Sequence, residues 1–266
     1  NEASLQLVTW VGLTSALFAA IIACTQTDIK RVLAYSTMSQ IGYMMFALGV
    51  SGYGGEQGLG FTGSLFHLFT HAFFKSLLFL AAGAVIHFIH SNEMTDMGGL
   101  RKHMPLTNIV FLVGCLAIAG VPPLSGFFSK EEILLASFNA DKIVYGIALL
   151  TSGLTAFYMF RLYFSIFWNK ASSPLERRGG EVHSEHHSEG TMAMKLPLIL
   201  LAVLTIAAGI IPFGEYVSSD GKQLETHLHL LFSIAPVAVA ALGIGLATYL
   251  YKKESNKPAA IAHTIG

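Results

Sequence analysis

Charged side chains are scarce in this sequence: Asp, Glu, Lys and Arg make up 12% of its 266 residues. Soluble domains carry about 25% charged residues, so a soluble globular protein is excluded. Basic and acidic residues balance at 16 each, and this net charge gives no reason to expect a nucleic-acid partner. Hydrophobic residues reach 53% and the mean hydropathy is +0.58. The composition therefore predicts a membrane protein that crosses the bilayer several times.

Cysteine is nearly absent as well, and Cys24 and Cys115 both stand in apolar runs. We expect them to act as small hydrophobic side chains, not as a disulfide or a metal pair. The sequence has no serine elbow, no dinucleotide fingerprint and no four-cysteine cluster. The chain starts at Asn1 and enters an apolar run without a charged segment and cleavage site. We therefore expect no signal peptide, and a sequence that is a piece of a longer chain.

What the sequence does have is long apolar runs, which predict an all-α bundle with about seven transmembrane spans. The fourth run is too long for one crossing and contains Pro122 and Pro123, which break the helical hydrogen-bond ladder. We therefore predict a discontinuous helix there, with Lys130 just past the break. Pro197 is expected at the entrance of the sixth span, where a helix tolerates proline. The expected spans are residues 5–24, 32–50, 61–87, 106–138, 143–168, 196–211 and 230–251.

The basic residues outside these spans predict the orientation of the chain. When alternate loops are assigned to opposite sides, one side receives only Lys142 and Lys222. An excess of Lys and Arg marks the cytoplasmic side, so the N-terminus is predicted outside and the C-terminus in the cytoplasm. The other side receives eleven: Lys30, Arg31, Arg101, Lys102, Lys170, Arg177, Arg178, Lys195, Lys252, Lys253 and Lys257.

His67, His71 and Lys75 stand four residues apart inside the third span. At this spacing they form one polar stripe on one face of a helix. A helix over residues 61–87 would be about 40 Å long, more than the ~30 Å hydrocarbon core, and Lys75 falls near its middle. A cation there costs roughly 2.5–3.5 kcal/mol, so it should face protein or water and pair with something. The stripe is a candidate proton path; the alternative is a buried polar seam that holds helices together.

Two loops invite functional interpretations that we do not adopt. The glycine-rich segment 51–60 follows no strand and carries no Lys-Ser/Thr pair, so it is expected to be a flexible connector. The segment His183–Glu189 could bind a divalent metal through His186 and His187. A hydrated loop is the simpler interpretation, and we place no metal site there.

Several long strings resemble the antiporter-like subunits of respiratory complex I and their Mrp-antiporter relatives. The two-histidine-plus-lysine form and the FFSKE form are most similar to chain L, the largest of these subunits. The match runs in order over about residues 1–170 and is weaker afterwards. The strings are TDIKRVLAYSTMSQIGY at 27–43, FHLFTHAFFKSLLF at 66–79, MGGLRKHMP at 97–105, AGVPPLSGFFSKEEIL at 119–134 and TAFYMFR at 155–161.

The resemblance implies a fold of two inverted five-helix repeats, each with one broken helix, and a proton path at mid-membrane depth. It divides the chain into a second repeat at 1–170, a cytoplasmic loop at 171–195, and two further spans with a tail at 196–266. The first repeat, with a glutamate and a lysine important for pumping, would precede Asn1. A lateral helix and a last span would lie beyond Gly266. The implied location is the bacterial inner membrane, beside an adjacent antiporter-like subunit.

Proton relay requires groups that change protonation at a tolerable energy. Burial disfavours the charged form of lysine and histidine, and a nearby carboxylate favours it. Lys75 and Lys130 are the predicted switching bases, and His67 and His71, with bridging water, carry protons between them.

Three further residues are candidates with open alternatives. Lys30, at the cytoplasmic end of the second span, is either a relay residue or a lysine that extends to the interface. Glu131 and Glu132 either pair with Lys130, mark the outward exit, or form a solvated carboxylate pair. We expect Arg161 to be structural.

Three other classes of protein remain as alternatives. A membrane cytochrome needs histidines on facing helices, whereas His67, His71, His87 and His90 are expected on one helix. A Mrp-type sodium/proton antiporter or a membrane-bound hydrogenase subunit shares most of the strings. A purely structural bundle would not conduct. No cofactor is expected in this chain, and NADH, FMN, iron–sulfur clusters and quinone are expected in other subunits of a proton-pumping NADH:quinone oxidoreductase.

Overall fold

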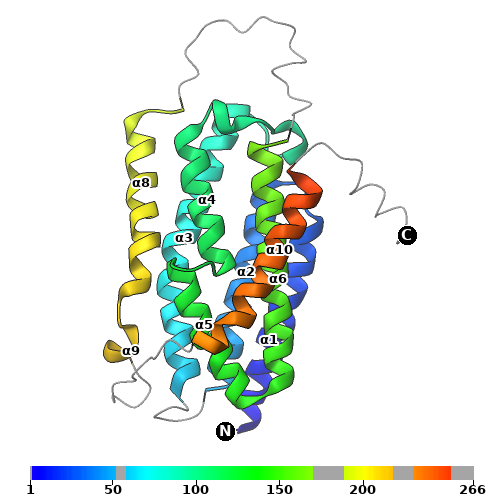
Figure 1. Cartoon of the computed structure of the whole chain (residues 1–266), viewed down its shortest axis with the longest axis vertical. Coiled ribbons are helices and arrows are strands. Elements are labelled where there is room, and N and C mark those ends of the chain that lie inside the picture. The colour runs from blue at the N-terminus through cyan, green and yellow to red at the C-terminus, as the bar shows by residue number, and fades with distance from the viewer. Residues whose placement is uncertain (1, 52–57, 170–188, 218–229, 253–266) are drawn as a thin grey trace, which may run out of the picture.

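The chain folds as an all-α bundle in a computed structural model that describes residues 2–51, 58–169, 189–217 and 230–252 (Figure 1). This confirms the predicted fold class. Short 3₁₀ turns cover residues 94–96, 100–102 and 208–210. The helices are α1 (Glu2–Thr25), α2 (Ile29–Gly49), α3 (Leu59–Ile89), α4 (Pro105–Ala119), α5 (Ser125–Ala140), α6 (Lys142–Phe167), α8 (Met192–Ala207), α9 (Phe213–Tyr216) and α10 (Leu230–Tyr251).

The outward faces of the long helices are apolar, as a lipid environment requires. Phe18 on α1, Leu200 on α8 and Leu242 on α10 are each more than half exposed. Among the described helices, α1, α3, α6, α8 with its 3₁₀ extension, and α10 are long and apolar enough to cross a membrane. Neither α2 nor the α4–α5 pair is in that set, so the number of seven spans stays a prediction.

The predicted break in the fourth span is present. Helix α4 ends at Ala119, and Gly120 follows with a left-handed φ of 77° that closes the helix. Helix α5 begins at Ser125. With 15 and 16 residues, α4 and α5 are each shorter than the ~20 residues that one crossing needs. The two halves therefore stack into one discontinuous element.

The break depends on close backbone contact between its two halves. A Cβ atom on Gly126, in the first turn of α5, would overlap the carbonyl oxygen of Ala117 in the last turn of α4. Only glycine lets the two helix ends approach this closely.

Local sequence explains where other helices begin. Asp28 caps α2, with its carboxylate accepting a hydrogen bond from the Arg31 backbone N–H at 3.0 Å. Asp141 caps α6 in the same way, through the N–H of Ile143. An N-cap carboxylate satisfies backbone donors that have no partner inside the helix. The starts of α2 and α6 are therefore determined by the local sequence.

Some sequence predictions need correction or lie outside the described residues. Pro197 is inside α8, because that helix begins at Met192 and not at the expected Leu196. The candidate metal ligands His186 and His187 lie outside the described residues, as do residues 52–57 of the glycine-rich loop. Cys24 and Cys115 are free thiols, and Cys115 is buried in the apolar core, as predicted.

Candidate functional site

The predicted polar stripe lies in the protein interior. His67, His71 and Lys75 stand on successive turns of α3, and all three are buried, with Lys75 5% exposed. The neighbours of α3 include α2 on one side and α5 beyond the helix break. Its side chains can therefore meet polar groups from two other helices.

His67 joins these three helices through both of its ring nitrogens. Its Nδ1 lies 2.8 Å from the Ser129 hydroxyl on α5, and its Nε2 lies 3.1 Å from Oε1 of Gln40 on α2. An amide oxygen only accepts, so with this amide orientation the neutral ring donates from Nε2 and accepts at Nδ1 from Ser129. Protonation of the ring requires the Ser129 hydroxyl to turn and accept instead.

Ser129 has other partners toward which it can turn. Its hydroxyl lies 2.9 Å from Oγ1 of Thr70, and it reaches the Ser125 carbonyl at 3.3 Å. Either hydroxyl of the Thr70–Ser129 pair can donate. The His67 ring therefore sits at the end of a short hydroxyl chain whose donor direction can reverse.

Among the described residues, the hydrogen-bond partner of Lys75 is a backbone carbonyl and not a carboxylate. Its ammonium group donates to the carbonyl of Leu33 on α2 at 3.1 Å, and it lies 5.9 Å from the Phe79 ring centroid. Ser36, three residues after Leu33 on α2, accepts a hydrogen bond from the Tyr158 hydroxyl of α6 at 3.0 Å. The buried cation thus has a partner, as the sequence predicted, and that partner is a main-chain oxygen.

Lys130 is positioned by the helix break itself. Its ammonium donates to the carbonyl of Ile118 at 2.6 Å. Ile118 is in the last turn of α4, where carbonyl groups lack partners within the helix and the helix dipole favours a cation. The ammonium also lies 5.5 Å from the ring centroid of Tyr43. The broken helix therefore supplies a binding position for a lysine that is only 3% exposed.

His71 connects the surroundings of the two lysines. Its ring centroid lies 6.1 Å from that of His67, and both Lys75 and Lys130 lie within electrostatic range of it. Its Nε2 is buried and has no hydrogen-bond partner among the described residues. Buried polar atoms are normally satisfied by protein or water, so this nitrogen faces a position where a polar group is favoured.

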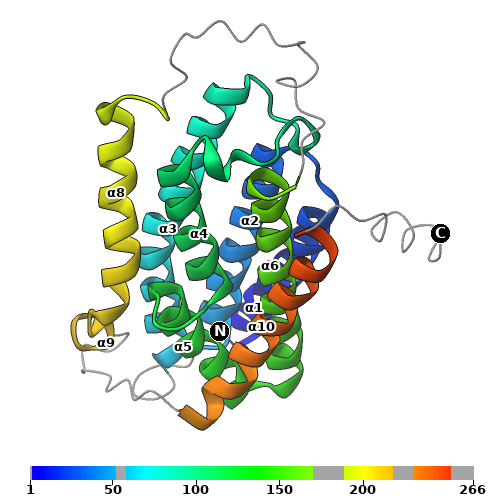
Figure 2. The same cartoon turned by 45° about the horizontal axis from the view of Figure 1, so that its top comes forward.

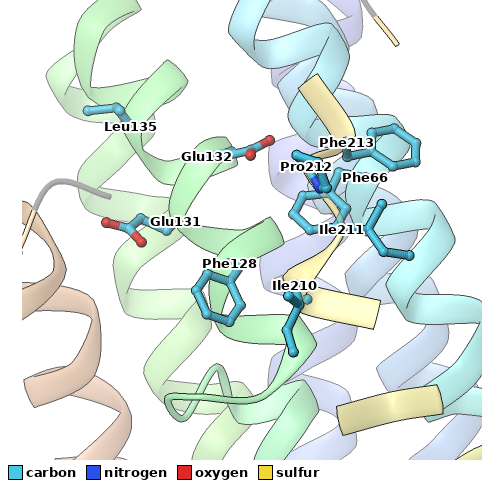
Figure 3. A pocket seen from close by; sticks show the side chains of 10 residues that line it. Phe66, Phe128, Glu131, Glu132, Leu135, Ile210, Ile211, Pro212 and Phe213 are labelled. Carbon is cyan, nitrogen blue, oxygen red and sulfur yellow. The ribbon is translucent and has the colours of Figure 1, made fainter. Parts of the chain in front are cut away.

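The Glu131 and Glu132 side chains extend into different surroundings (Figure 3). The Glu131 carboxylate accepts a hydrogen bond from Ser233 on α10. Glu132 points toward Pro212 and Phe66. Both carboxylates line a cavity of about 360 Å³, whose other lining residues are Phe66, Phe128, Leu135 and residues 209–213. Each glutamate is 6% exposed.

The structure does not bring Lys30 into this network. Lys30 is exposed in the first turn of α2, and its part in a relay stays a prediction. Arg161 is buried on α6 and stands 5.8 Å from the ring centroid of Tyr251.

Sequence reasoning missed the residues that link the stripe to its neighbours. Gln40, Thr70 and Ser129 are fully buried and carry the hydrogen bonds of His67. Polar residues inside apolar spans could have indicated one of these partners. Ser36, Gln40 and Tyr43 stand at helical spacing within the second span, which predicts that they share a face of α2. Within the described ranges, no group of three or more His, Cys, Asp or Glu side chains could hold a metal ion.

This chain is a membrane helix bundle with a buried lysine at a broken helix, as expected for an antiporter-like membrane protein. The family model of the NADH:quinone oxidoreductase/Mrp antiporter transmembrane region matches residues 1–155. The chain belongs to this family.

Relatives and a solved structure agree with that assignment. The chain is 39% identical to NAD(P)H-quinone oxidoreductase chain 5 of Picosynechococcus sp., over 97% of this chain and 43% of the relative. It is 40% identical to NADH-quinone oxidoreductase subunit L of Rickettsia conorii, over 94% of this chain and 38% of the relative. The chain thus spans less than half the length of these curated relatives.

A solved structure of the Mrp complex from Dietzia sp. DQ12-45-1b has a similar fold. The TM-score is 0.68 at 22% identity, over 94% of this chain and 49% of that chain.

Proposed function

We propose that this chain carries protons through the membrane as part of an antiporter-like subunit of a NADH:quinone oxidoreductase. The observation that carries the proposal is the arrangement of the two buried lysines. Each is bound to a main-chain carbonyl, and the buried His71 lies within electrostatic range of both. A lysine without a carboxylate partner can release its proton at lower cost than one in an ion pair.

In the proposed relay, a proton passes from Lys75 through His71 to His67, with water at the unpaired Nε2 of His71. The Ser129 hydroxyl then connects His67 to the neighbouring Lys130. His67 takes up the proton at Nδ1, its unprotonated nitrogen, and releases it from the same nitrogen to the Ser129 hydroxyl. Ser129 must then reverse its donor direction and accept, which its bond with Thr70 allows.

Beyond Lys130, we propose that Glu131 and Glu132 receive the proton and release it through the cavity that they line. Lys30 is kept as a candidate entrance residue on the opposite side. Its exposure would let it exchange protons with the cytoplasm, and the alternative is a lysine that only anchors the helix at the interface.

The relatives' names indicate the larger assembly. We propose that this chain works beside other membrane subunits, among them an adjacent antiporter-like subunit, while NADH, FMN, iron–sulfur clusters and quinone are bound elsewhere in the complex. A charge change in the neighbouring subunit would alter the proton affinity of a buried lysine and so couple redox chemistry to transport.

We also propose the predicted orientation, location and division of the chain. Lys30, Arg101, Lys102 and Lys252 belong to the same end of the bundle, whereas Lys142 starts α6 at the other end. This supports a cytoplasmic assignment for the first end, in the bacterial inner membrane. Residues 1–170 would be the five-span repeat, 171–195 the cytoplasmic loop and 196–266 two further spans with a tail.

The whole complex reconstituted in proteoliposomes tests this function. NADH oxidation is expected to acidify one side of the vesicle membrane without sodium, and a protonophore should abolish the gradient. A strict requirement for sodium ions would contradict the proton relay and would favour the sodium/proton antiporter alternative.

The hydroxyl link gives a more local prediction. Ser129→Ala removes the acceptor that His67 needs when its ring is protonated, a loss of about 1 kcal/mol or more. The rate of proton transfer through this chain is therefore expected to fall about fivefold in the complex that carries Ser129→Ala. A pH-sensitive dye in the proteoliposomes measures that rate. The matched control is Ser137→Ala, which removes a buried serine of α5 whose hydroxyl donates to the Ile133 carbonyl of the same helix. Equal effects of the two changes would remove Ser129 from the relay.

A further inference from the structure

The C-terminal ends of α6 and α10 lie side by side (Figure 2). Near these ends, three cations lie close to two aromatic rings. We call Arg101, Arg161 and Lys252 the cation cluster. The Arg101 guanidinium lies 4.0 Å from the Trp168 ring centroid, and the Lys252 ammonium lies 4.9 Å from it. The Arg161 guanidinium lies 5.8 Å from the centroid of Tyr251, the residue before Lys252. All three charges therefore lie near the end of α10.

Arg161 is the unusual member of the cluster. It is only 9% exposed, yet its Nη1 has no hydrogen-bond partner among the described residues. A buried guanidinium nitrogen without an acceptor is costly, and most buried polar groups have a partner. Trp168, the C-cap residue of α6, stands seven positions after Arg161, so the two side chains lie on one side of the helix. Among the described residues nothing supplies an acceptor for the Arg161 Nη1, and an anion would supply one.

The surroundings identify the kind of anion that fits. Trp168 and Tyr251 stand at helix ends, where aromatic side chains mark the level of lipid headgroups. Directly below, α10 exposes Leu242, Leu246 and Tyr249, a surface on which acyl chains can lie. Basic pockets between helices on the cytoplasmic side bind anionic lipid headgroups.

We propose that the cation cluster binds the phosphate group of an anionic phospholipid in the adjoining leaflet. Arg161 donates to the phosphate oxygens from below, while Arg101 and Lys252, both exposed, close around the headgroup from the membrane surface. The acyl chains lie along α10. The bound phosphate would also offset the mutual repulsion of the three cations.

The test uses the whole complex in nanodiscs with a photoreactive phosphatidylglycerol. The readout is labelling of peptides from the ends of α6 and α10. Labelling is expected to saturate and to be displaced by unlabelled phosphatidylglycerol. Phosphatidylcholine and inorganic phosphate should not displace it. Displacement by inorganic phosphate alone would assign the site to a free anion and overturn the proposal, as would equal displacement by phosphatidylcholine.

Variants separate the cluster from general surface charge. Arg161→Gln should raise the phosphatidylglycerol concentration for half-labelling about tenfold, because a charge-assisted hydrogen bond is lost. Lys252→Gln, at an exposed position that does not endanger folding, should raise it about fivefold. Lys102→Gln is the control, since Lys102 is an exposed neighbour of Arg101 outside the cluster, and it should change nothing. Unchanged labelling in both cluster variants, or an equal loss in the control, would overturn the proposal.

Discussion

A complex that carries Lys130→Gln is expected to move far fewer protons through this chain than the unchanged complex. Glutamine can still donate a hydrogen bond to the Ile118 carbonyl, so the broken helix should remain folded. It cannot take up or release a proton. The loss of one acid–base group slows proton transfer by about 10²-fold or more, so the proton path in this chain should be effectively closed.

The measurement is the number of protons moved per electron pair in proteoliposomes, which corrects for slower turnover. Lys142→Gln is the matched control, because Lys142 is an exposed lysine at the start of α6 that donates to a carbonyl of the preceding helix. Its ratio should equal that of the unchanged complex. A normal ratio in Lys130→Gln would remove Lys130 from the path.

Gly126→Ala is expected to have the largest effect on folding. The added Cβ overlaps the Ala117 backbone carbonyl, and a backbone atom at a helix end cannot move aside without separating α4 from α5. Overpacking of this kind costs about 1–3 kcal/mol or more. We expect a lower thermal midpoint and a reduced yield of assembled complex, measured by thermal unfolding of the purified complex and by blue-native gel electrophoresis.

Two other helical glycines provide the control for this substitution. A Cβ on Gly83 of α3 or on Gly146 of α6 would meet nothing within 4 Å. Alanine there should be neutral or should stabilise the helix by up to about 1 kcal/mol, because glycine is a poor helix former. If Gly126→Ala behaved like these two variants, the tight contact across the break would not be a requirement of the fold.

Helix positions and the break were predictable because they depend on local chemistry. Long apolar runs set the helices, and the two prolines with Gly120 set the interruption before Lys130. The spacing of His67, His71 and Lys75 placed them on one face without any knowledge of tertiary structure. These features follow from helix geometry and backbone hydrogen bonding, which the sequence displays directly.

The partners of these residues were not predictable from the sequence. Gln40 lies 27 positions before His67, and Ser129 lies 62 positions after it, so their contacts depend on how α2, α3 and α5 pack. Lys75 was expected to have a partner, and a glutamate was one candidate partner for Lys130. The observed partners are the carbonyls of Leu33 and Ile118, which carry no side-chain signal. The start of α8 at Met192 was also missed, because Pro197 suggested a later entrance.

In the proposed mechanism, Lys75 and Lys130 belong to one relay through the buried histidines. The decisive measurement is the number of protons moved per electron pair in complexes that carry Lys75→Gln, Lys130→Gln and both changes together. Groups that act as a unit are non-additive, so we predict that each single variant loses as much as the double variant. Undiminished ratios in the single variants, or a double variant that loses the sum of two partial losses, would contradict a single relay.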